Sequence, residues 1–402
     1  MKKKALSLVL ASAMVASLVG CGSSSAETET PSAAETSTTE AAATTEAATT
    51  EAATTEAATE AAATTDNSDK KIAMITDSGD ITDESFNQIT WETCVAYGEA
   101  NGIETQYYKP AEDTDEERIN SVDLAIAEGA TVVVMPGYLF GPAIAEEQGL
   151  YPDVTFIAVD VTEGDIVNLA GENVALGDNV YICSFQEEQA GYLAGYAAVK
   201  DGYTSLGFLG GIAVPAVIRY GFGYIQGINA AAEEMGVDVD VKYYYGGQFY
   251  GDDAITARME GWYADGTQVV FACGGGIYTS AVDAAAQYDG KVIGVDVDQF
   301  PKIGDACITS AMKGLGSAVE TALDAYTSGN WASIGGKSEQ LGLTQGDYLG
   351  LPTDDASWGF KTFTKDEYET VLNGIKDGSI TVSNDTENQP EVGSHVTVTY
   401  VE

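Results

Sequence analysis

The chain is short of basic residues and of histidine. Its 402 residues include 18 Lys and Arg against 62 Asp and Glu, a formal net charge of −44, and one His. Nucleic-acid affinity comes mainly from cationic side chains that displace counterions from phosphates, so we expect no nucleic-acid partner. A single imidazole, His395, leaves almost no material for a Ser/His or Cys/His catalytic pair or for a multi-histidine metal site. We therefore expect no enzyme, no metal and no cofactor.

The apolar run near the N-terminus is too short to cross a bilayer. It spans residues 5–19 and follows three lysines, which is typical of a secretory signal peptide over residues 1–20. Residues 18–21, Leu-Val-Gly-Cys, resemble a bacterial lipobox, in which the cysteine becomes the lipidated first residue of the mature protein. We expect a lipid anchor at Cys21, the alternatives being an ordinary cleaved signal or a buried cysteine. The expected location is the extracytoplasmic face of a cell membrane, in a Gram-positive bacterium.

The next segment has nothing to bury. Residues 22–69 contain no Lys, no Arg and no aromatic residue, and Ala-Ala-Thr-Thr-Glu repeats from residue 42 to 56. This composition predicts a disordered tether over residues 21–69, with a root-mean-square span of roughly 40 Å if it behaves as a flexible coil. The signal peptide contributes +3 and the tether −10, so residues 70–402 carry the remaining −37. A neutral or cationic ligand suits that field better than a nucleotide does.

From residue 70 onward, apolar strands alternate with amphipathic helices. The first series predicts strands at 71–76, 104–108, 131–135 and 155–160, and helices near 85–101, 114–128 and 141–148. The second series predicts helices near 186–199, 216–235, 252–263 and 279–288, and strands at 205–209, 239–245, 268–272 and 291–295. Continuous apolar strands separated by helices indicate parallel sheets that are covered on both faces. We predict an α/β protein with two lobes.

Loops rich in Asp, Gly, Asn and Phe follow the predicted strands. They lie at residues 77–80, 136–140, 160, 210–211, 246–249, 274–276 and 296–299. Ligands of open α/β sheets bind outside the carboxyl ends of the strands. We therefore expect a cleft between two lobes that closes on a small polar molecule.

Several of these segments resemble one protein family. Residues 71–79 and 83–87 look like the first signature of the basic membrane protein family of solute-binding lipoproteins. Further matches follow in order at residues 188–195, 210–227, 270–276, 293–299 and 309–313. The resemblance implies a type I periplasmic-binding-protein fold, with two doubly wound lobes, a ligand cleft and three hinge crossings. On this basis we expect an N-lobe at 70–183 plus about 308–337, and a C-lobe at 184–307 plus about 338–402.

The resemblance also implies a function. Members of this family are the substrate-binding subunits of ABC importers, and the best-known members bind purine nucleosides. We expect a monomeric, lipid-anchored receptor that delivers a nucleoside to ABC permease and ATPase subunits. Two alternatives stay open: a sensing receptor for another small polar solute, and a nucleoside-processing enzyme. The enzyme would need a carboxylate cluster aimed at the glycosidic bond, and the cleft segments contain only separated carboxylates.

Polar ligand contacts are implied at both ends of the nucleoside. The resemblance places Asp77 and Asn87 on the base, where a carboxylate accepts hydrogen bonds from N–H groups and an amide both donates and accepts. It places Asp296 and Lys313 on the ribose hydroxyls. Gly275 would let the backbone approach the sugar.

Aromatic residues are implied on the two faces of the base. Phe86 in the N-lobe and Phe249 in the C-lobe resemble the pair that sandwiches it, and such stacking is worth about 1–3 kcal/mol per base. Tyr245 and Tyr250 are alternatives for the second face, because the spacing after Phe249 departs from the family pattern by one residue.

Four cysteines lie in apolar segments without CxxC spacing. They are Cys94, Cys183, Cys273 and Cys307. We expect buried free thiols, with a disulfide as the alternative, since sequence distance says nothing about Cα separation.

Overall fold

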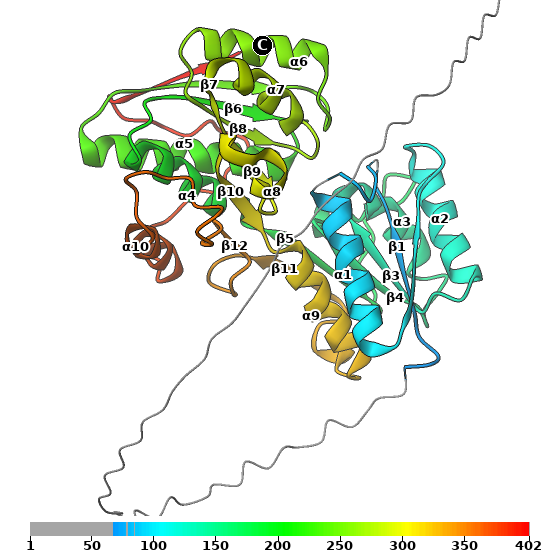
Figure 1. Cartoon of the computed structure of the whole chain (residues 1–402). Coiled ribbons are helices and arrows are strands. Elements are labelled where there is room, and N and C mark those ends of the chain that lie inside the picture. The colour runs from blue at the N-terminus through cyan, green and yellow to red at the C-terminus, as the bar shows by residue number, and fades with distance from the viewer. Residues whose placement is uncertain (1–66, 78, 84, 402) are drawn as a thin grey trace, which may run out of the picture. The chain divides into compact units, whose positions relative to one another are not determined.

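The computed structural model describes residues 67–77, 79–83 and 85–401. The predicted signal peptide, the lipidation at Cys21 and almost all of the predicted tether lie outside these residues. Within them, no helix has the length and apolar character needed to cross a membrane. Figure 1 shows the helices and strands of the described part.

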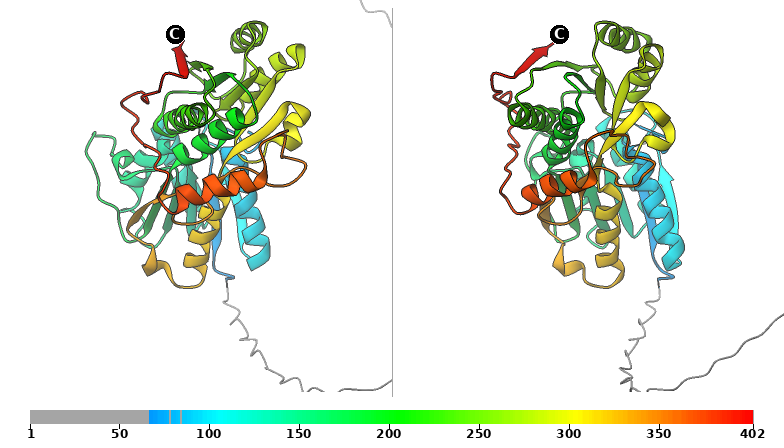
Figure 2. Two further views of the ribbon diagram at one scale, coloured as in Figure 1. Left: turned by 90° about the vertical axis from the view of Figure 1, so that its left-hand side faces the viewer. Right: turned by 60° about the vertical axis from the view of Figure 1, so that its left-hand side comes forward.

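The N-lobe is built on a parallel six-stranded sheet in the order β11-β5-β4-β3-β1-β2. Its strands are β1 (Lys71–Ile75), β2 (Glu104–Tyr108), β3 (Val132–Pro136), β4 (Thr155–Val159), β5 (Val180–Phe185) and β11 (Lys337–Leu341). Its helices are α1 (Phe86–Asn101), α2 (Asp115–Ala127), α3 (Gly141–Glu147) and α9 (Leu315–Thr327). Alternate residues of the central strands point to opposite faces, and both faces are apolar because α1 and α9 cover one and α2 and α3 the other. Figure 2 shows α9 beside α1 from two directions.

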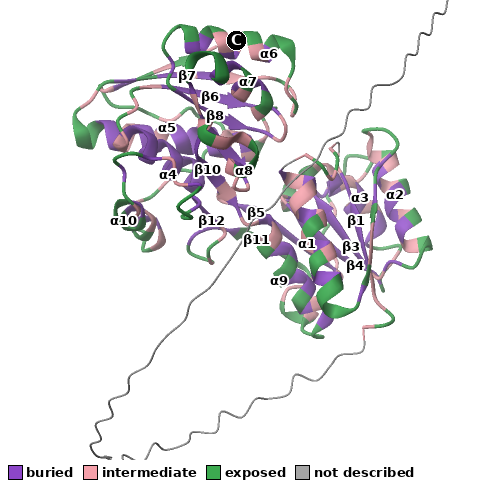
Figure 3. Cartoon of the chain, in the orientation of Figure 1, coloured by how far each residue is buried: buried purple, intermediate pink, exposed green. Residues whose placement is uncertain are grey.

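The C-lobe is built on a seven-stranded sheet in the order β12-β10-β9-β8-β6-β7-β13, in which only β12 is antiparallel to its neighbour. Its strands are β6 (Ser205–Gly210), β7 (Val239–Tyr245), β8 (Val269–Cys273), β9 (Lys291–Asp296), β10 (Cys307–Lys313), β12 (Leu349–Gly350) and β13 (Val396–Tyr400). Its helices are α4 (Glu187–Lys200), α5 (Pro215–Met235), α6 (Asp253–Ala264), α7 (Tyr278–Tyr288), α8 (Phe300–Ile303) and α10 (Lys365–Lys376). Helices α4 and α5 cover one face and α6 and α7 the other, so the central strands are buried, as the purple ribbons of Figure 3 show.

The chain crosses between the lobes three times. The crossings lie between β5 and α4, between β10 and α9, and between β11 and β12. The sequence places the return to the N-lobe at about residue 308, whereas β10 pairs with β9 and moves that crossing to residues 313–315. It also ends this N-lobe segment at about 337, whereas β11 pairs with β5 as far as Leu341. The second shift arises because β11 is a mostly exposed edge strand without an apolar pattern, and because its partner β5 lies far away in the sequence.

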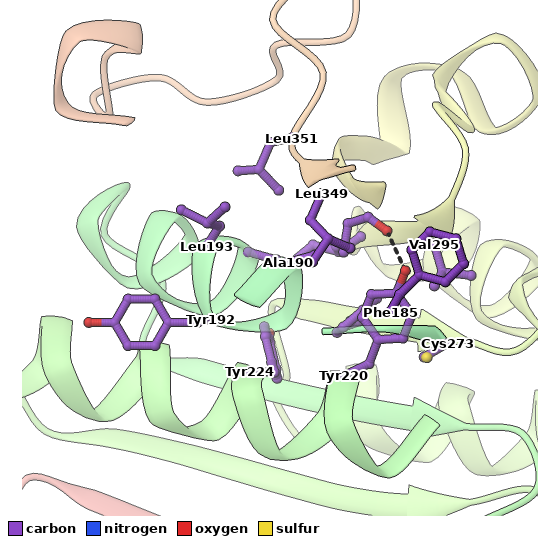
Figure 4. Packing of buried hydrophobic residues seen from close by; sticks show 14 of the residues in the cluster. Phe185, Ala190, Tyr192, Leu193, Tyr220, Tyr224, Cys273, Val295, Leu349 and Leu351 are labelled. Atoms are coloured by element: carbon purple, nitrogen blue, oxygen red, sulfur yellow. Dashed lines mark hydrogen bonds between the residues drawn. The ribbon is translucent and has the colours of Figure 1, made fainter. Parts of the chain in front are cut away.

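Helices α4 and α5 touch backbone to backbone. Glycines on each helix lie against carbonyl oxygens of the other, and a Cβ atom at any of them would overlap such an oxygen: Gly191 and Gly195 on α4, and Gly223 and Gly227 on α5. Glycine is required here because only a bare Cα allows so close an approach. Figure 4 shows part of the apolar cluster around these helices, including Phe185, Tyr220, Cys273 and Val295.

The four cysteines of the described part are free thiols. Cys94, Cys183, Cys273 and Cys307 are all buried and unpaired, which confirms the prediction. Burial raises the pKa of the Cys94 thiol to about 12, so the thiol stays protonated and unreactive at neutral pH.

Candidate ligand-binding site

A cavity of about 190 Å³ lies between the lobes, at the carboxyl ends of the strands. The N-lobe supplies the loops after β1, β3 and β4, and the C-lobe supplies the loops after β7, β8 and β9 together with the start of α5. All seven residues that the sequence predicts as ligand contacts line this cavity: Asp77, Phe86, Asn87, Phe249, Gly275, Asp296 and Lys313. The parallel topology of the two sheets explains their convergence, because it gathers the loop after each strand at one edge.

Asp77 and Asn87 hold each other. Oδ1 of Asp77 accepts hydrogen bonds from the Gly79 N–H at 2.7 Å and from Asn87 Nδ2 at 2.9 Å, and the Asp77 N–H donates to Asn87 Oδ1 at 3.1 Å. Burial raises the pKa of Asp77, against the lowering effect of these hydrogen bonds. The amide of Asn87 is thus engaged at both ends, while Oδ2 of Asp77 has no hydrogen-bond partner among the described residues and can receive a donor from a ligand.

Asp83 organises the start of α1. Its Oδ1 accepts from the N–H groups of Ser85 and Gln88, each at 3.0 Å. Its Oδ2 accepts from the N–H and from Nδ2 of Asn87, each at 2.9 Å. This carboxylate therefore fixes the first turn of α1, which carries Phe86 and Asn87, in the manner of a helix cap. The prediction named the segment 83–87 but assigned no role to Asp83.

The aromatic faces come from opposite lobes. Phe86 begins α1 and Phe249 follows β7, and both line the cavity. Tyr245 instead packs on Phe208 and shares a 2.8 Å hydrogen bond with Tyr243. Tyr250 is 63% exposed and is not a lining residue. Of the three candidates for the second aromatic face, Phe249 is the one at the cavity.

Two glycines bring the backbone close to Phe249. Gly274 and Gly275 have φ values of 147° and 50°, which L side chains rarely adopt, and a Cβ at either position would press against Phe249. Gly275 lines the cavity, and its left-handed backbone is held against Phe249.

Lys313 is a buried cation that three carboxylates surround. Its Nζ lies 2.7 Å from Asp160 Oδ2, 3.3 Å from Glu187 Oε1 and 3.8 Å from Asp296 Oδ1, and the side chain is 3% exposed. The ring of Phe86 lies 5.2 Å from Nζ. Burial alone would lower the pKa of Lys313, but the three carboxylates outweigh it and raise the pKa above its usual range. The ammonium group is therefore charged under all ordinary conditions.

The partners of Lys313 form a network of alternating charge. Nε of Arg219 donates to Glu187 Oε2 at 2.6 Å, and Lys313 donates to the other oxygen of Glu187. Burial would raise the pKa of Glu187, but the two cations outweigh it and lower the pKa. Burial raises the pKa of Asp160 to about 7 despite Lys313, and Oδ1 of Asp160 is buried without a hydrogen-bond partner in the described part.

Asp296 has both oxygens engaged by hydroxyl groups. Ser85 Oγ donates to Oδ2 at 2.6 Å, and the Tyr220 hydroxyl donates to Oδ1 at 3.2 Å. Asp296 has a φ of 64°, in the left-handed region that non-glycine residues rarely adopt. Such a backbone persists only where the surrounding structure holds it.

The sequence alone assigns no role to six residues at this site. They are Asp83, Ser85, Asp160, Glu187, Arg219 and Tyr220. Asp160 had a visible signal, since it ends a predicted strand in a loop that was singled out. Ser85, Arg219 and Tyr220 lie in segments that carry the family resemblance. No local pattern pairs Arg219 with Glu187, 32 residues away, or Ser85 with Asp296, 211 residues away.

Comparisons with known proteins identify the family and agree with the fold. A family model described as Bmp, ABC transporter substrate-binding protein PnrA-like, matches residues 70–383. The ABC transporter nucleoside-binding protein BmpA of Lactococcus lactis subsp. cremoris is 27% identical over 340 residues, which cover 78% of this chain and 89% of that protein. Basic membrane protein B of Borreliella burgdorferi is 27% identical over 287 residues, covering 70% and 80% of the two chains.

Solved structures show the same architecture. An ABC transporter solute-binding protein from Aeropyrum pernix K1 has a TM-score of 0.66 at 20% identity and covers 79% of this chain and 94% of its own. A solute-binding protein from Conexibacter woesei has a TM-score of 0.63 at 22% identity and covers 78% and 99%. The predicted two-lobed α/β fold of type I is thereby confirmed, and these similar proteins are binding proteins rather than enzymes.

Proposed function

Because the chain belongs to the Bmp family of PnrA-like ABC transporter substrate-binding proteins, we propose that it binds a nucleoside between its lobes and delivers it to an ABC permease. The observation that carries the proposal is the set of groups that line one cavity. Asp77 supplies a carboxylate, Phe86 and Phe249 come from opposite lobes, and Oδ1 of Asp296 lies 3.8 Å from Nζ of Lys313. The N–H groups of a base, its flat ring and a sugar diol would each find a partner among these residues.

The base end favours a ligand with N–H donors. Oδ2 of Asp77 would accept from a ring or exocyclic N–H of the base, while Asn87 would hold the carboxylate rather than contact the base directly. Stacking between Phe86 and Phe249 rewards ring area, so a purine is our proposed ligand over a pyrimidine. The relative from Lactococcus, named as nucleoside-binding, supports this substrate class.

The sugar end favours hydroxyl groups over phosphate. Asp296 would accept from ribose hydroxyls and Lys313 would donate to their oxygens. Asp160, Glu187 and Asp296 surround the single ammonium group, so an added phosphate would meet more negative charge than positive. The proposed ligand is therefore a nucleoside and not a nucleotide.

Calorimetric titration tests the ligand class. Adenosine, guanosine, inosine, cytidine, uridine, adenine and adenosine monophosphate would be titrated into the full chain, and we expect micromolar or tighter binding for the purine nucleosides only. Asp296→Asn should weaken adenosine binding by about tenfold to a hundredfold, because a hydrogen bond to a charged group is lost. Asp240→Asn, at an exposed position of β7, is the matched control and should bind like the wild type. Absence of binding by every nucleoside would end the proposal.

We also propose that Cys21 carries the lipid anchor and that the protein acts on the extracytoplasmic side of the membrane. The support is the Leu-Val-Gly-Cys segment and the apolar run before it. Metabolic labelling with a radioactive fatty acid in a bacterial host should mark the wild type and not Cys21→Ser. Labelling of the variant to the same extent would contradict the anchor, whatever the ligand.

A further inference from the structure

The hydroxyl of Ser85 connects the two lobes inside the cavity. Ser85 lies in the N-lobe directly before α1, and its Oγ donates the 2.6 Å hydrogen bond to Asp296 at the end of β9 in the C-lobe. Ser85 is 1% exposed, so the bond is shielded from water. Ser85 also borders a second groove, between α1 and residues 297–302. The bond therefore spans the lobe interface in the wall between two spaces, where it must break if the lobes separate at this point.

Both ends of this hydrogen bond are held in place. On the N-lobe side, Asp83 Oδ1 accepts from the Ser85 N–H, which fixes the backbone that carries the hydroxyl. On the C-lobe side, the Tyr220 hydroxyl holds the other oxygen of Asp296 at 3.2 Å, and the left-handed backbone of Asp296 sets where the carboxylate begins. Neither partner is a flexible surface side chain that could form the bond by chance.

The bond sets what Asp296 can still accept. An ionised carboxylate has about four acceptor positions, two on each oxygen. Ser85 takes one on Oδ2 and Tyr220 takes one on Oδ1. Each oxygen is left with about one free position, so the carboxylate can receive two neighbouring hydroxyls of one ligand in a fixed orientation. A ligand with a single hydroxyl would use half of this arrangement.

We propose that Ser85 is a specificity-determining residue: it orients Asp296 to receive two neighbouring ligand hydroxyls, and the same bond ties their recognition to closure of the lobes. The ligand class is a solute with a vicinal diol, as in a ribonucleoside, in preference to its 2′-deoxy analogue. This part rests on the proposed function. The closure part does not, because the Ser85–Asp296 hydrogen bond joins the two lobes directly and involves no ligand atom.

Titration with three related probes tests the specificity. In the full chain, Ser85→Ala should weaken adenosine binding by about tenfold, 2′-deoxyadenosine binding less and adenine binding least. A role in folding or in closure alone would weaken the binding of all three probes by the same factor. Ser85→Thr, which keeps a hydroxyl, should recover most of the preference for adenosine. Ser121→Ala is the matched control, since it removes another buried serine hydroxyl of the N-lobe that bonds only within its own helix, to the Glu117 carbonyl.

A distance measurement tests closure without ligand. Spin labels at Glu116→Cys on α2 and Ala257→Cys on α6, with Cys21→Ser, report the separation of the lobes by pulsed electron resonance; the four remaining thiols are buried. Ser85→Ala should lengthen and broaden the distance distribution, and Ser121→Ala should not. If the wild type binds no nucleoside, the proposed function fails and this distance alone decides the role of Ser85. If Ser85→Ala matches the wild type in both the titration and the distances, the role of Ser85 is refuted.

Discussion

Replacing Lys313 with methionine should destabilise the fold by about 3–5 kcal/mol at about pH 8, because it removes one partner from a buried ion network. Methionine keeps much of the volume of the lysine stem, so the loss is mainly electrostatic. Asp160, Glu187 and Asp296 lie 2.7, 3.3 and 3.8 Å from Nζ, and Arg219 would be the remaining cation of the network. Folds of this kind are stable by about 5–15 kcal/mol, so the expected loss is a large share of the total.

The loss of stability caused by Lys313→Met should be smaller in mildly acidic solution. Burial raises the pKa of Asp160 to about 7, so at about pH 5.5 this carboxyl group is already protonated in the folded wild type and Lys313 has one charge fewer to neutralise. In the variant the pKa of Asp160 rises further, because Lys313 lowers it in the wild type. The variant thus gains stability relative to the wild type as the pH falls from about 8 toward 7, and below about 7 both folded proteins carry this proton and gain alike. Urea denaturation at the two pH values, extrapolated to zero denaturant, measures both losses.

Lys242 offers a matched control for this prediction. It also lies on a strand and pairs with a carboxylate, Asp265, at 3.3 Å, but the two side chains are 28% and 76% exposed. Such a surface pair is worth about 0–1 kcal/mol, so Lys242→Met should cost at most about 1 kcal/mol at either pH. A loss for Lys313→Met as small as that of this control, or an equal loss at both pH values, would refute the reasoning about the buried network.

Further expectations concern the aromatic face, a buried carboxyl group and the glycine contacts. Phe249→Ala should weaken adenosine binding by about 1–3 kcal/mol in calorimetry, whereas Tyr250→Ala, which lies off the cavity, should not change it. Burial raises the pKa of Glu147 to about 7, so the free energy of unfolding of the wild type falls as the pH rises from about 5 to 7. Glu147→Gln does not titrate, and in urea denaturation it should therefore gain stability relative to the wild type over this pH range. Gly195→Ala should cost about 1–3 kcal/mol in thermal unfolding because its Cβ would overlap a carbonyl of α5, whereas Gly261→Ala, in open space on α6, should be neutral or stabilising by up to about 1 kcal/mol; equal effects would contradict the contact.

The alternation of strands and helices could be predicted closely where burial imposes a clear pattern. β3 reads Val-Val-Val-Met-Pro and is buried throughout, and the predicted boundaries agree with the structure to within one residue. β11 reads Lys-Ser-Glu-Gln-Leu, and its one fully buried residue is Leu341. What makes β11 a strand is its pairing with β5, a non-local contact that no local pattern records.

The cavity likewise has some features that could be predicted from the sequence and others that could not. The positions of Asp77 and Asp296 could be predicted because a parallel sheet gathers the ends of its strands at one edge. The engagement of the Asn87 amide by Asp77 and Asp83, and of Asp296 by Ser85, could not be predicted. These bonds depend on side-chain directions and lobe positions that residue type and spacing leave undetermined.

The glycine contacts between α4 and α5 should make the two helices move as one rigid unit. α4 begins at Glu187, directly after the first crossing, where the carboxylate accepts from Arg219 and Lys313 of the cavity. α5 extends over 21 residues, about 31 Å, to Met235. Helices whose backbones touch cannot slide past each other without breaking that contact. A small rotation at Glu187 would therefore reach the exposed end of α5 at Met235 as a larger displacement. Opening or closing of the cavity would then change the outer surface of the C-lobe, far from the bound molecule.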